Sequence, residues 1–204
     1  MSTAMWDERY SAQELVWSAT PNQWVEELTA DLPPGRVLDL AAGEGRNALW
    51  LAERGWDATA VDFSQVGLDR AQQLAGQRLG SDAPRLRTVC ADLLTYAPAA
   101  QAYDLVLVVY LHLPAEQRGI VMRAAAAAVA PRGRLIVIAH DTRNLTEGIG
   151  GPQDPAVLYT AADLTDDIDG SGLAIERATV SSRAVQTDAG TREALDAILV
   201  ARRP

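Results

Sequence analysis

Up to residue 139, short apolar segments alternate with segments of helical spacing. The apolar segments carry consecutive apolar residues and lie at 37–41, 58–61, 86–90, 105–110 and 135–139. Strands that are apolar on both faces belong in a parallel sheet covered by helices on both sides. Ser64 is placed to cap one of the intervening helices and Pro114 to start another. We expect these helices at 47–54, 64–77 and 114–129.

The pattern changes after residue 139. Residues 142–155 contain three glycines and two prolines, which predicts a long irregular loop. Thr160 and Asp163 have the spacing of a capping box, which predicts a short helix near 161–168. Two strand-like stretches follow, at 173–185 and 193–201. They predict a terminal antiparallel hairpin, although the start of the second stretch also suits a helix.

Together these elements predict a single α/β domain. We expect a Rossmann-like, mostly parallel seven-stranded sheet with helices on both faces and a C-terminal antiparallel hairpin. Upstream of it, spaced apolar residues at 11–31 predict a helix that Pro21 could open.

Charge and composition narrow the function. The 204 residues include 18 basic and 27 acidic side chains, for a net charge of -9. No basic face stands out, so we expect neither nucleic acid nor an anionic membrane as partner. All the basic residues are arginine. The absence of lysine excludes Schiff-base chemistry, a P-loop lysine and the Tyr–Lys pair of many short dehydrogenases.

Location and thiol chemistry follow from equally simple features. No apolar run is longer than that at 105–111, which is far too short to span a membrane. The first nine residues lack the basic and apolar regions of a secretory signal, so we expect a cytoplasmic protein. Cys90 is the single cysteine, which excludes an internal disulfide and a multi-thiolate metal site. We expect it to be buried packing rather than a nucleophile.

The most informative stretch is VLDLAAGEGRNA at 37–48. An apolar strand runs into a turn with Gly43 and Gly45, and a helix follows. Such a turn tolerates positive φ and lets backbone approach a ligand at the carboxyl end of a parallel strand. The alternative is an ordinary strand–helix turn that uses glycine only for sharpness.

Asp62 ends the second strand, about twenty positions after this turn. A carboxylate there can accept hydrogen bonds from both ribose hydroxyls of a nucleoside. Its alternative role is to cap the helix that starts near Ser64. Phe63 could lie against an adenine or simply pack.

The turn leaves two cofactors open, because Gly43, Gly45 and Ala48 also fit the dinucleotide fingerprint. Asp39 distinguishes them. Its carboxylate suits the ammonium and sulfonium of S-adenosylmethionine better than a pyrophosphate. Asp92 follows the third strand and could accept from the adenine amine, with a helix-capping or turn role as its alternative.

These motifs resemble those of class I S-adenosylmethionine-dependent methyltransferases. The segments GEGRNA at 43–48, AVDFS at 60–64 and WDERY at 6–10 are similar to the tellurite-resistance and thiopurine methyltransferase group. The resemblance implies S-adenosylmethionine as cofactor and a cofactor-binding set of Asp39, Ala41, Gly43, Gly45, Arg46, Asn47, Asp62, Phe63, Asp92, Leu93 and Val109. Ala41 departs from the family, which often has glycine there. Alanine suits the loop if its φ is negative.

Candidate acceptor-side residues are few. Tyr110, His112 and His140 lie at or just after the ends of the fourth and fifth strands, at the expected cofactor edge, and are weak catalytic candidates. A histidine at a strand end is more often structural, and His140 with Asp141 is too little for a metal site, so we expect no metal. A thiolate or a reduced selenium, tellurium or arsenic acceptor needs no general base, whereas an amine or hydroxyl needs one.

The resemblance also suggests how the chain divides. We expect an N-terminal helical lid at 1–34, a cofactor-binding core at 35–141 and an acceptor loop with hairpin at 142–204. The aromatic residues that could close over loop 148–152, or pack into the core instead, are Trp6, Tyr10, Trp17 and Trp24.

The expected function is methyl transfer to a small molecule. A nicotinamide-dependent oxidoreductase is the first alternative, although it lacks the usual lysine and a visible nicotinamide-binding half. A non-catalytic S-adenosylmethionine-binding module is the second. The sequence does not define the oligomeric state.

Overall fold

The computed structural model describes residues 20–188 and 190–204. Its strands are β1 (Arg36–Leu40), β2 (Asp57–Asp62), β3 (Leu86–Cys90), β4 (Tyr103–Val109), β5 (Val129–His140), β6 (Ala174–Thr187) and β7 (Gly190–Arg202). Its α-helices are α2 (Gln23–Thr29), α3 (Arg46–Glu53), α4 (Gln65–Leu79), α5 (Ala115–Ala128) and α6 (Ala161–Asp167). Short 3-10 helices lie at Gly80–Arg85, Thr142–Leu145 and Pro155–Val157.

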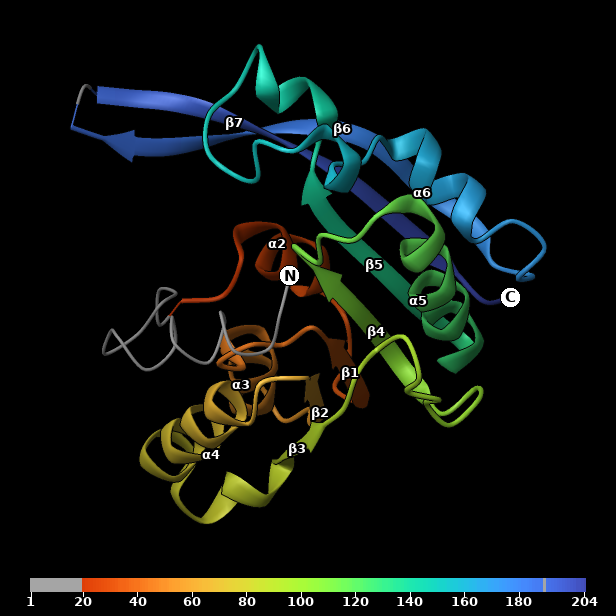
Figure 1. The fold of residues 1–204 in the computed structure, drawn as a ribbon. Coiled ribbons are helices and arrows are strands. Elements are labelled where there is room, and N and C mark those ends of the chain that lie inside the picture. Colours follow the sequence, from red (N-terminus) through yellow and green to blue (C-terminus); the bar gives the residue numbers. More distant parts are fainter. Residues whose placement is uncertain (1–19, 189) are drawn as a thin grey trace.

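The strands form one seven-stranded sheet in the order β3-β2-β1-β4-β5-β7-β6. Strands β1 to β5 are parallel, and β7 is antiparallel to both β5 and β6. This confirms the predicted α/β fold with its terminal hairpin (Figure 1). The strand order reverses between β1 and β4, and a crevice at the carboxyl ends of the strands beside such a point is the usual ligand site of an open α/β sheet.

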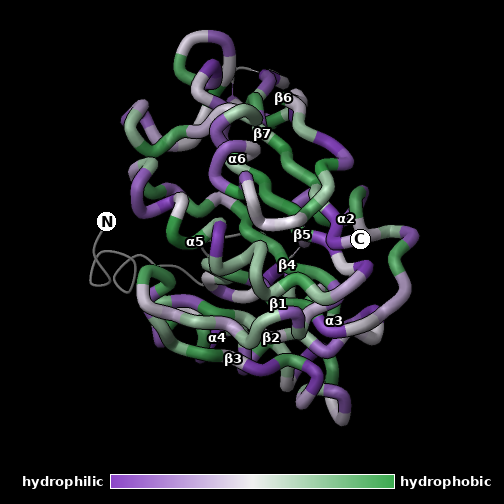
Figure 2. Tube along the Cα trace, turned by 90° about the vertical axis from the view of Figure 1, so that its right-hand side faces the viewer, coloured by the Kyte–Doolittle hydropathy of each residue, from purple (hydrophilic) through white to green (hydrophobic). Residues whose placement is uncertain are grey.

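The alternation of side chains along the strands creates two cores. In β4, Leu105 and Leu107 pack with Trp24 of α2 on one face. Val106 and Val108 pack with Met122 of α5 on the other. Both faces of the central strands are therefore buried, as the unbroken apolar runs predicted. Figure 2 shows hydrophobic stretches along the central strands and hydrophilic residues in many outer turns.

The predicted helix starts are largely correct. The Ser64 side chain accepts from the amide of Gly67, and Thr160 and Asp163 form the expected capping box. Helix α5 follows Pro114 directly. The first described helix, α2, is capped by Asn22. The helix expected at 11–31 lies partly outside the described residues. Trp6, Tyr10 and Trp17 lie outside them altogether.

The terminal hairpin is longer than predicted. Pairing of β5 with β7 runs from Arg134–Arg202 to His140–Asp196, whereas pairing of β6 with β7 continues to Thr187–Gly190. The far end of the hairpin therefore projects beyond the sheet as a two-stranded arm (Figure 1). Residues 193–197 are strand, so the helical alternative for them is wrong. No helix in the described ranges is long and apolar enough to cross a membrane.

Candidate functional site

The glycine turn after β1 is held by its neighbours. The Ala42 amide donates to the Val61 carbonyl at 3.0 Å, which fixes the turn against β2. Gly43 and Gly45 have φ of 56° and 73°. A Cβ on Gly45 would lie 2.8 Å from the Cβ of Ala71 in α4. Glycine at 45 is therefore required both by the backbone conformation and by the close approach of α4.

Ala41 corrects one expectation. Its φ is 59°, in the left-handed region rather than at a negative value. A residue with a Cβ pays roughly 1–2 kcal/mol for this conformation. The turn thus keeps the shape that glycine would give it at the expense of local strain, which is a feature that binding sites often have.

Asp62 organises the same turn. Its carboxylate accepts from the Gly43 amide at 2.8 Å and from the Ser64 amide at 2.9 Å, and the residue is 4% exposed. Each carboxylate oxygen can accept more than one hydrogen bond. Asp62 therefore links the glycine turn to the start of α4.

Asp39 is the most unusual side chain here. It lies on β1, is 1% exposed, and neither carboxylate oxygen has a hydrogen-bond partner in the described part of the chain. Burial raises its pKa to about 7, while the nearby Ala48 amide and Arg46 guanidinium act in the opposite direction. A buried carboxylate without a partner is costly, and a bound cation would remove that cost.

Two further contacts fix the turn, and the sequence reasoning missed both. Glu44 is 2% exposed and pairs with Arg70 of α4 at 2.9 Å. The Asn47 side chain accepts from the amide of Asn22 at 2.9 Å, just before α2. Only the polarity of Glu44 within a tight turn could have signalled the first contact.

The other predicted cofactor residues lie around the carboxyl ends of the strands. Phe63 and Arg46 are half-buried, and Leu93 and Val109 are 8% and 7% exposed. Asp92 is exposed, and its side chain accepts from the Leu94 amide at 2.9 Å. That contact is the turn role weighed as its alternative. The ligand roles of all these residues stay predictions.

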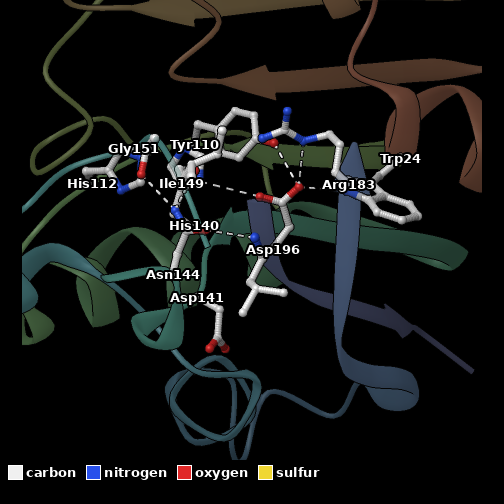
Figure 3. A network of polar contacts seen from close by, with 12 residues as sticks. Trp24, Tyr110, His112, His140, Asp141, Asn144, Ile149, Gly151, Arg183 and Asp196 are labelled. Atoms are coloured by element: carbon white, nitrogen blue, oxygen red, sulfur yellow. Dashed lines mark hydrogen bonds and ion pairs between the residues drawn. The ribbon is translucent and has the colours of Figure 1, made fainter. Parts of the chain in front are cut away.

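The three acceptor-side candidates come together as a stack of rings. Tyr110 and His140 lie 4.6 Å apart between ring centroids, with an interplanar angle of 18°. The ring centroids of His112 and His140 are 5.4 Å apart, with an interplanar angle of 8°. Tyr110 directly follows β4 with φ of 56°, a strained conformation for a residue of this size. Figure 3 shows the stack beside Asp196.

Asp196 is the residue that sequence reasoning missed. It lies on β7 with no exposure. Its Oδ2 accepts from Trp24 Nε1 at 2.8 Å, Tyr110 OH at 3.0 Å and Arg183 Nε at 3.0 Å. Burial acts to raise the pKa of Asp196, but the nearby His140 ring and the Arg183 guanidinium outweigh burial and lower that pKa. A lone acid inside the apolar stretch 194–201 was the available signal.

The tautomer of His112 follows from its contacts. Its Nδ1 lies 3.2 Å from the Val157 carbonyl, which can only accept, so Nδ1 carries the hydrogen. Burial, together with the neighbouring His140, lowers the pKa of His112 to about 4. The ring is therefore neutral at physiological pH.

Cys90 differs from expectation, and Asp141 does not contribute to a metal site among the described residues. Cys90 is exposed rather than buried, because β3 is the edge strand of the sheet. Asp141 pairs with Arg143 at 3.0 Å instead of joining His140. Across residues 20–188 and 190–204, no group of three or more His, Cys, Asp or Glu side chains could hold a metal. The expectation of no metal stays a prediction.

Comparison with known sequences points to one domain type. Residues 37–133 match the family model described as "Methyltransferase domain". Over 61 residues the chain is 44% identical to the "Putative methyltransferase YqeM" of Bacillus subtilis (strain 168), covering 29% of this chain and 25% of that protein. It is 34% identical over 113 residues to the "Ubiquinone biosynthesis O-methyltransferase" of Bordetella avium (strain 197N), covering 54% and 45%. The chain thus spans less than half the length of these relatives.

Solved structures share the fold over nearly the whole chain. TehB from Haemophilus influenzae superposes with a TM-score of 0.74 and 18% identity, covering 97% of this chain and 67% of TehB. Magnesium protoporphyrin IX methyltransferase (ChlM) from Synechocystis PCC 6803 with bound SAH gives 0.70 and 21%, covering 100% and 95%. At such identities the likeness concerns the fold.

Proposed function

We propose that this chain transfers a methyl group from S-adenosylmethionine to a small molecule, because residues 37–133 match the model of a methyltransferase domain. The observation that carries the proposal is the buried carboxylate of Asp39, which has no hydrogen-bond partner among residues 20–188 and 190–204 and lies beside a strained glycine turn. A pyrophosphate would place negative charge beside that carboxylate. An amino acid ammonium would instead supply the missing donor and charge.

The residues present fit this cofactor. Asp39 would pair with the ammonium, and the turn at Gly43 and Gly45 would bring backbone amides close to the amino acid part. Asp62 would hold the ribose, since its carboxylate is already fixed by two amides. Arg46, Asn47, Phe63, Asp92, Leu93 and Val109 would surround the rest of the nucleoside. SAM or SAH in relatives of the same fold supports the assignment.

The cofactor supplies a methyl group bound to positively charged sulfur. The protein's contribution is to align the acceptor in line with that carbon and to exclude water, and alignment alone is worth on the order of 7–11 kcal/mol. The ring stack of Tyr110, His140 and His112 lies at the ends of β4 and β5, next to the cofactor turn at the end of β1. We propose that the acceptor binds beside this stack.

Two classes of small acceptor differ in their chemistry. A thiolate or a reduced metalloid species is already ionised and attacks without a base. The motif resemblance to the tellurite-resistance and thiopurine group, taken alone, suggests this class, whereas the geometry around His140 decides between the two classes below. A hydroxyl or N–H acceptor must lose a proton during transfer, and it needs a group to receive that proton.

Ligand binding tests the proposal directly. S-adenosylhomocysteine, NAD and NADP are titrated separately while thermal stability is followed. At one hundred times its dissociation constant a ligand adds about 2.7 kcal/mol to the free energy of unfolding. We expect stabilisation by S-adenosylhomocysteine alone. The stabilisation should be weaker in Asp39→Asn. It should be unchanged in Asp57→Asn, because the exposed Asp57 side chain lies at the end of β2 that is remote from the glycine turn. Stabilisation only by a nicotinamide cofactor would overturn the proposal.

Transfer itself is measured with a methyl-labelled cofactor on thiols, metalloid oxyanions, amines and phenols. Tight binding of S-adenosylhomocysteine without transfer to any of them would indicate a binding module rather than an enzyme.

A further inference from the structure

Two buried polar atoms face each other across the end of the β5–β7 pair. His140 Nδ1 and Asp196 Oδ1 are 3.5 Å apart, and neither has a hydrogen-bond partner among the described residues. The two residues are direct partners in the antiparallel register. The other oxygen of Asp196, Oδ2, already accepts from three donors (Figure 3). Oδ1 is therefore the one place where this carboxylate can receive the Nδ1 hydrogen of His140.

Asp196 is suited to orient an imidazole. Burial raises its pKa, but the nearby His140, Arg183 and Trp24 together lower that pKa, so the carboxyl is ionised despite complete burial. An ionised carboxylate at Nδ1 selects the tautomer that carries the hydrogen there, and it stabilises positive charge that develops on the ring. Nε2 is then left with a free lone pair.

The ring of His140 is confined on two sides. Tyr110 stacks on it at 4.6 Å, and the loop at Gly151 passes so close that a Cβ there would lie 2.6–3.0 Å from the ring atoms Cδ2, Cγ and Nε2. Gly151 also has φ of 72°, so glycine suits this position in two respects. Movement of this loop away from the ring would uncover Nε2.

His112 cannot take the same role. Its pKa of about 4 makes it a poor proton acceptor at neutral pH, and its Nδ1 is committed to a backbone carbonyl. Tyr110 is equally unsuited, because burial and then the neighbouring Asp196 raise its pKa to about 12. Arg183, a further charged group of this cluster, is bonded to Asp196.

We infer that His140 is the general base of the reaction, held by Asp196, and that the acceptor is a planar molecule with a hydroxyl or ring N–H. This rests on the proposed methyltransferase function. The acceptor oxygen or nitrogen forms its bond to the methyl carbon, and the carbon–sulfur bond breaks with its electrons staying on sulfur. The acceptor proton passes to Nε2 of His140. A base at this point would be idle for an ionised thiolate or metalloid acceptor.

The first test reads the tautomer, independently of turnover. The chain has only two histidines, so nitrogen NMR of histidine-labelled protein resolves both, and His112→Gln assigns them. We expect the neutral His140 ring to carry its hydrogen on Nδ1. Asp196→Asn keeps an acceptor oxygen but loses the charge. In this variant the Nδ1 resonance should shift toward the value for the mixture of two tautomers that free imidazole adopts. A hydrogen mainly on Nε2 in the unaltered protein would overturn the inference.

The second test compares acceptors. His140→Gln should lower kcat on a catechol or a ring N–H heterocycle by about 100–10,000-fold, with recovery as pH rises and the acceptor ionises by itself. The same variant should leave transfer to thiophenolate or tellurite within a few-fold of the unaltered protein. Equal losses on both classes would indicate a structural role and sink the inference. So would transfer to ionised acceptors alone.

Binding of S-adenosylhomocysteine separates this inference from the function beneath it. The affinity should be the same in His140→Gln and the unaltered protein. If the unaltered protein does not bind S-adenosylhomocysteine, the methyltransferase function itself is refuted. Normal binding with the wrong tautomer would refute only the base. If no acceptor probe is methylated, the tautomer still decides.

Discussion

The proposed cofactor half around Gly43 and Asp62 and the proposed acceptor half around Asp196 are assembled over very different distances in the sequence. The Gly43 amide reaches Asp62 across 19 positions, within one β-turn-α-β unit. Trp24 reaches Asp196 across 172 positions, and Tyr110 reaches it across 86. The first half therefore depends on local turn geometry, while the second depends on the whole sheet being in register.

This difference predicts that damage to the two halves can be separated. Changes near the glycine turn should reduce cofactor affinity. Changes around Asp196 should reduce stability or transfer while cofactor affinity is kept. The following experiments test that separation, beginning with the largest expected effect.

The pH dependence of Asp39 should be the largest effect. Its pKa is about 7 in the folded protein against 3.8 for an ordinary aspartate, so between these pH values the folded state holds a proton that the unfolded state has lost. The free energy of unfolding should fall as pH rises through this window, by on the order of 4 kcal/mol from this residue. Asp39→Asn should lack this fall. Denaturant titrations of both proteins from pH 4 to 8 measure the difference, and parallel curves would contradict it.

The close approach at Gly45 should come next. Gly45→Ala meets both a positive φ and the Ala71 Cβ at 2.8 Å. Gly80→Ala is its matched control, because Gly80 also has a positive φ but has open space around it. We expect Gly45→Ala to cost about 1–3 kcal/mol more in urea unfolding. Equal costs would mean that α4 moves away without resistance.

Asp62→Ala should weaken S-adenosylhomocysteine about tenfold to a hundredfold in calorimetric titration, because a charged acceptor is worth roughly 1.5–3 kcal/mol. Asp57→Ala, at the other end of β2, loses only an exposed pair with Arg85 and should leave the affinity unchanged. An unchanged affinity in Asp62→Ala would separate this residue from the cofactor.

Trp24→Phe should have the smallest effect, confined to the acceptor half. It keeps a large apolar ring but removes the Nε1 hydrogen bond to Asp196. We expect a loss of about 1–2 kcal/mol in stability with S-adenosylhomocysteine affinity unchanged. Trp56→Phe, which loses no hydrogen bond to any residue in the described ranges, is the control for ring size. A weakened cofactor in Trp24→Phe would show that the halves are not separable.

The same contrast explains what the sequence could predict. The parallel strands, the capping box at Thr160 and the glycine turn depend on neighbours in the chain, and periodicity and turn chemistry reveal them. The placement of Tyr110, His112 and His140 together followed from one rule, that parallel strands end at the same edge. Asp196 escaped because its partners lie on four separate elements, and one sequence contains no signal that joins them.

Two errors have the same origin. Ala41 was judged to suit the loop on the condition that its φ is negative, but its φ is 59° in the turn that the bond from Ala42 to Val61 fixes. Cys90 was expected inside because its strand is apolar, whereas the sheet order places β3 at the edge. Each depends on a neighbour that only the folded sheet supplies.

Helix α2 contacts both halves at once. Its cap residue Asn22 bonds to Asn47 at the start of α3, and its Trp24 bonds to Asp196 on β7. If either ligand displaces this helix, thermodynamic linkage requires the two affinities to change by one common factor. An acceptor that raises the affinity for the cofactor would then have its own affinity raised by the same factor. By the same linkage, bound S-adenosylhomocysteine would strengthen the binding of the methylated product. Release of either product would weaken the hold on its companion.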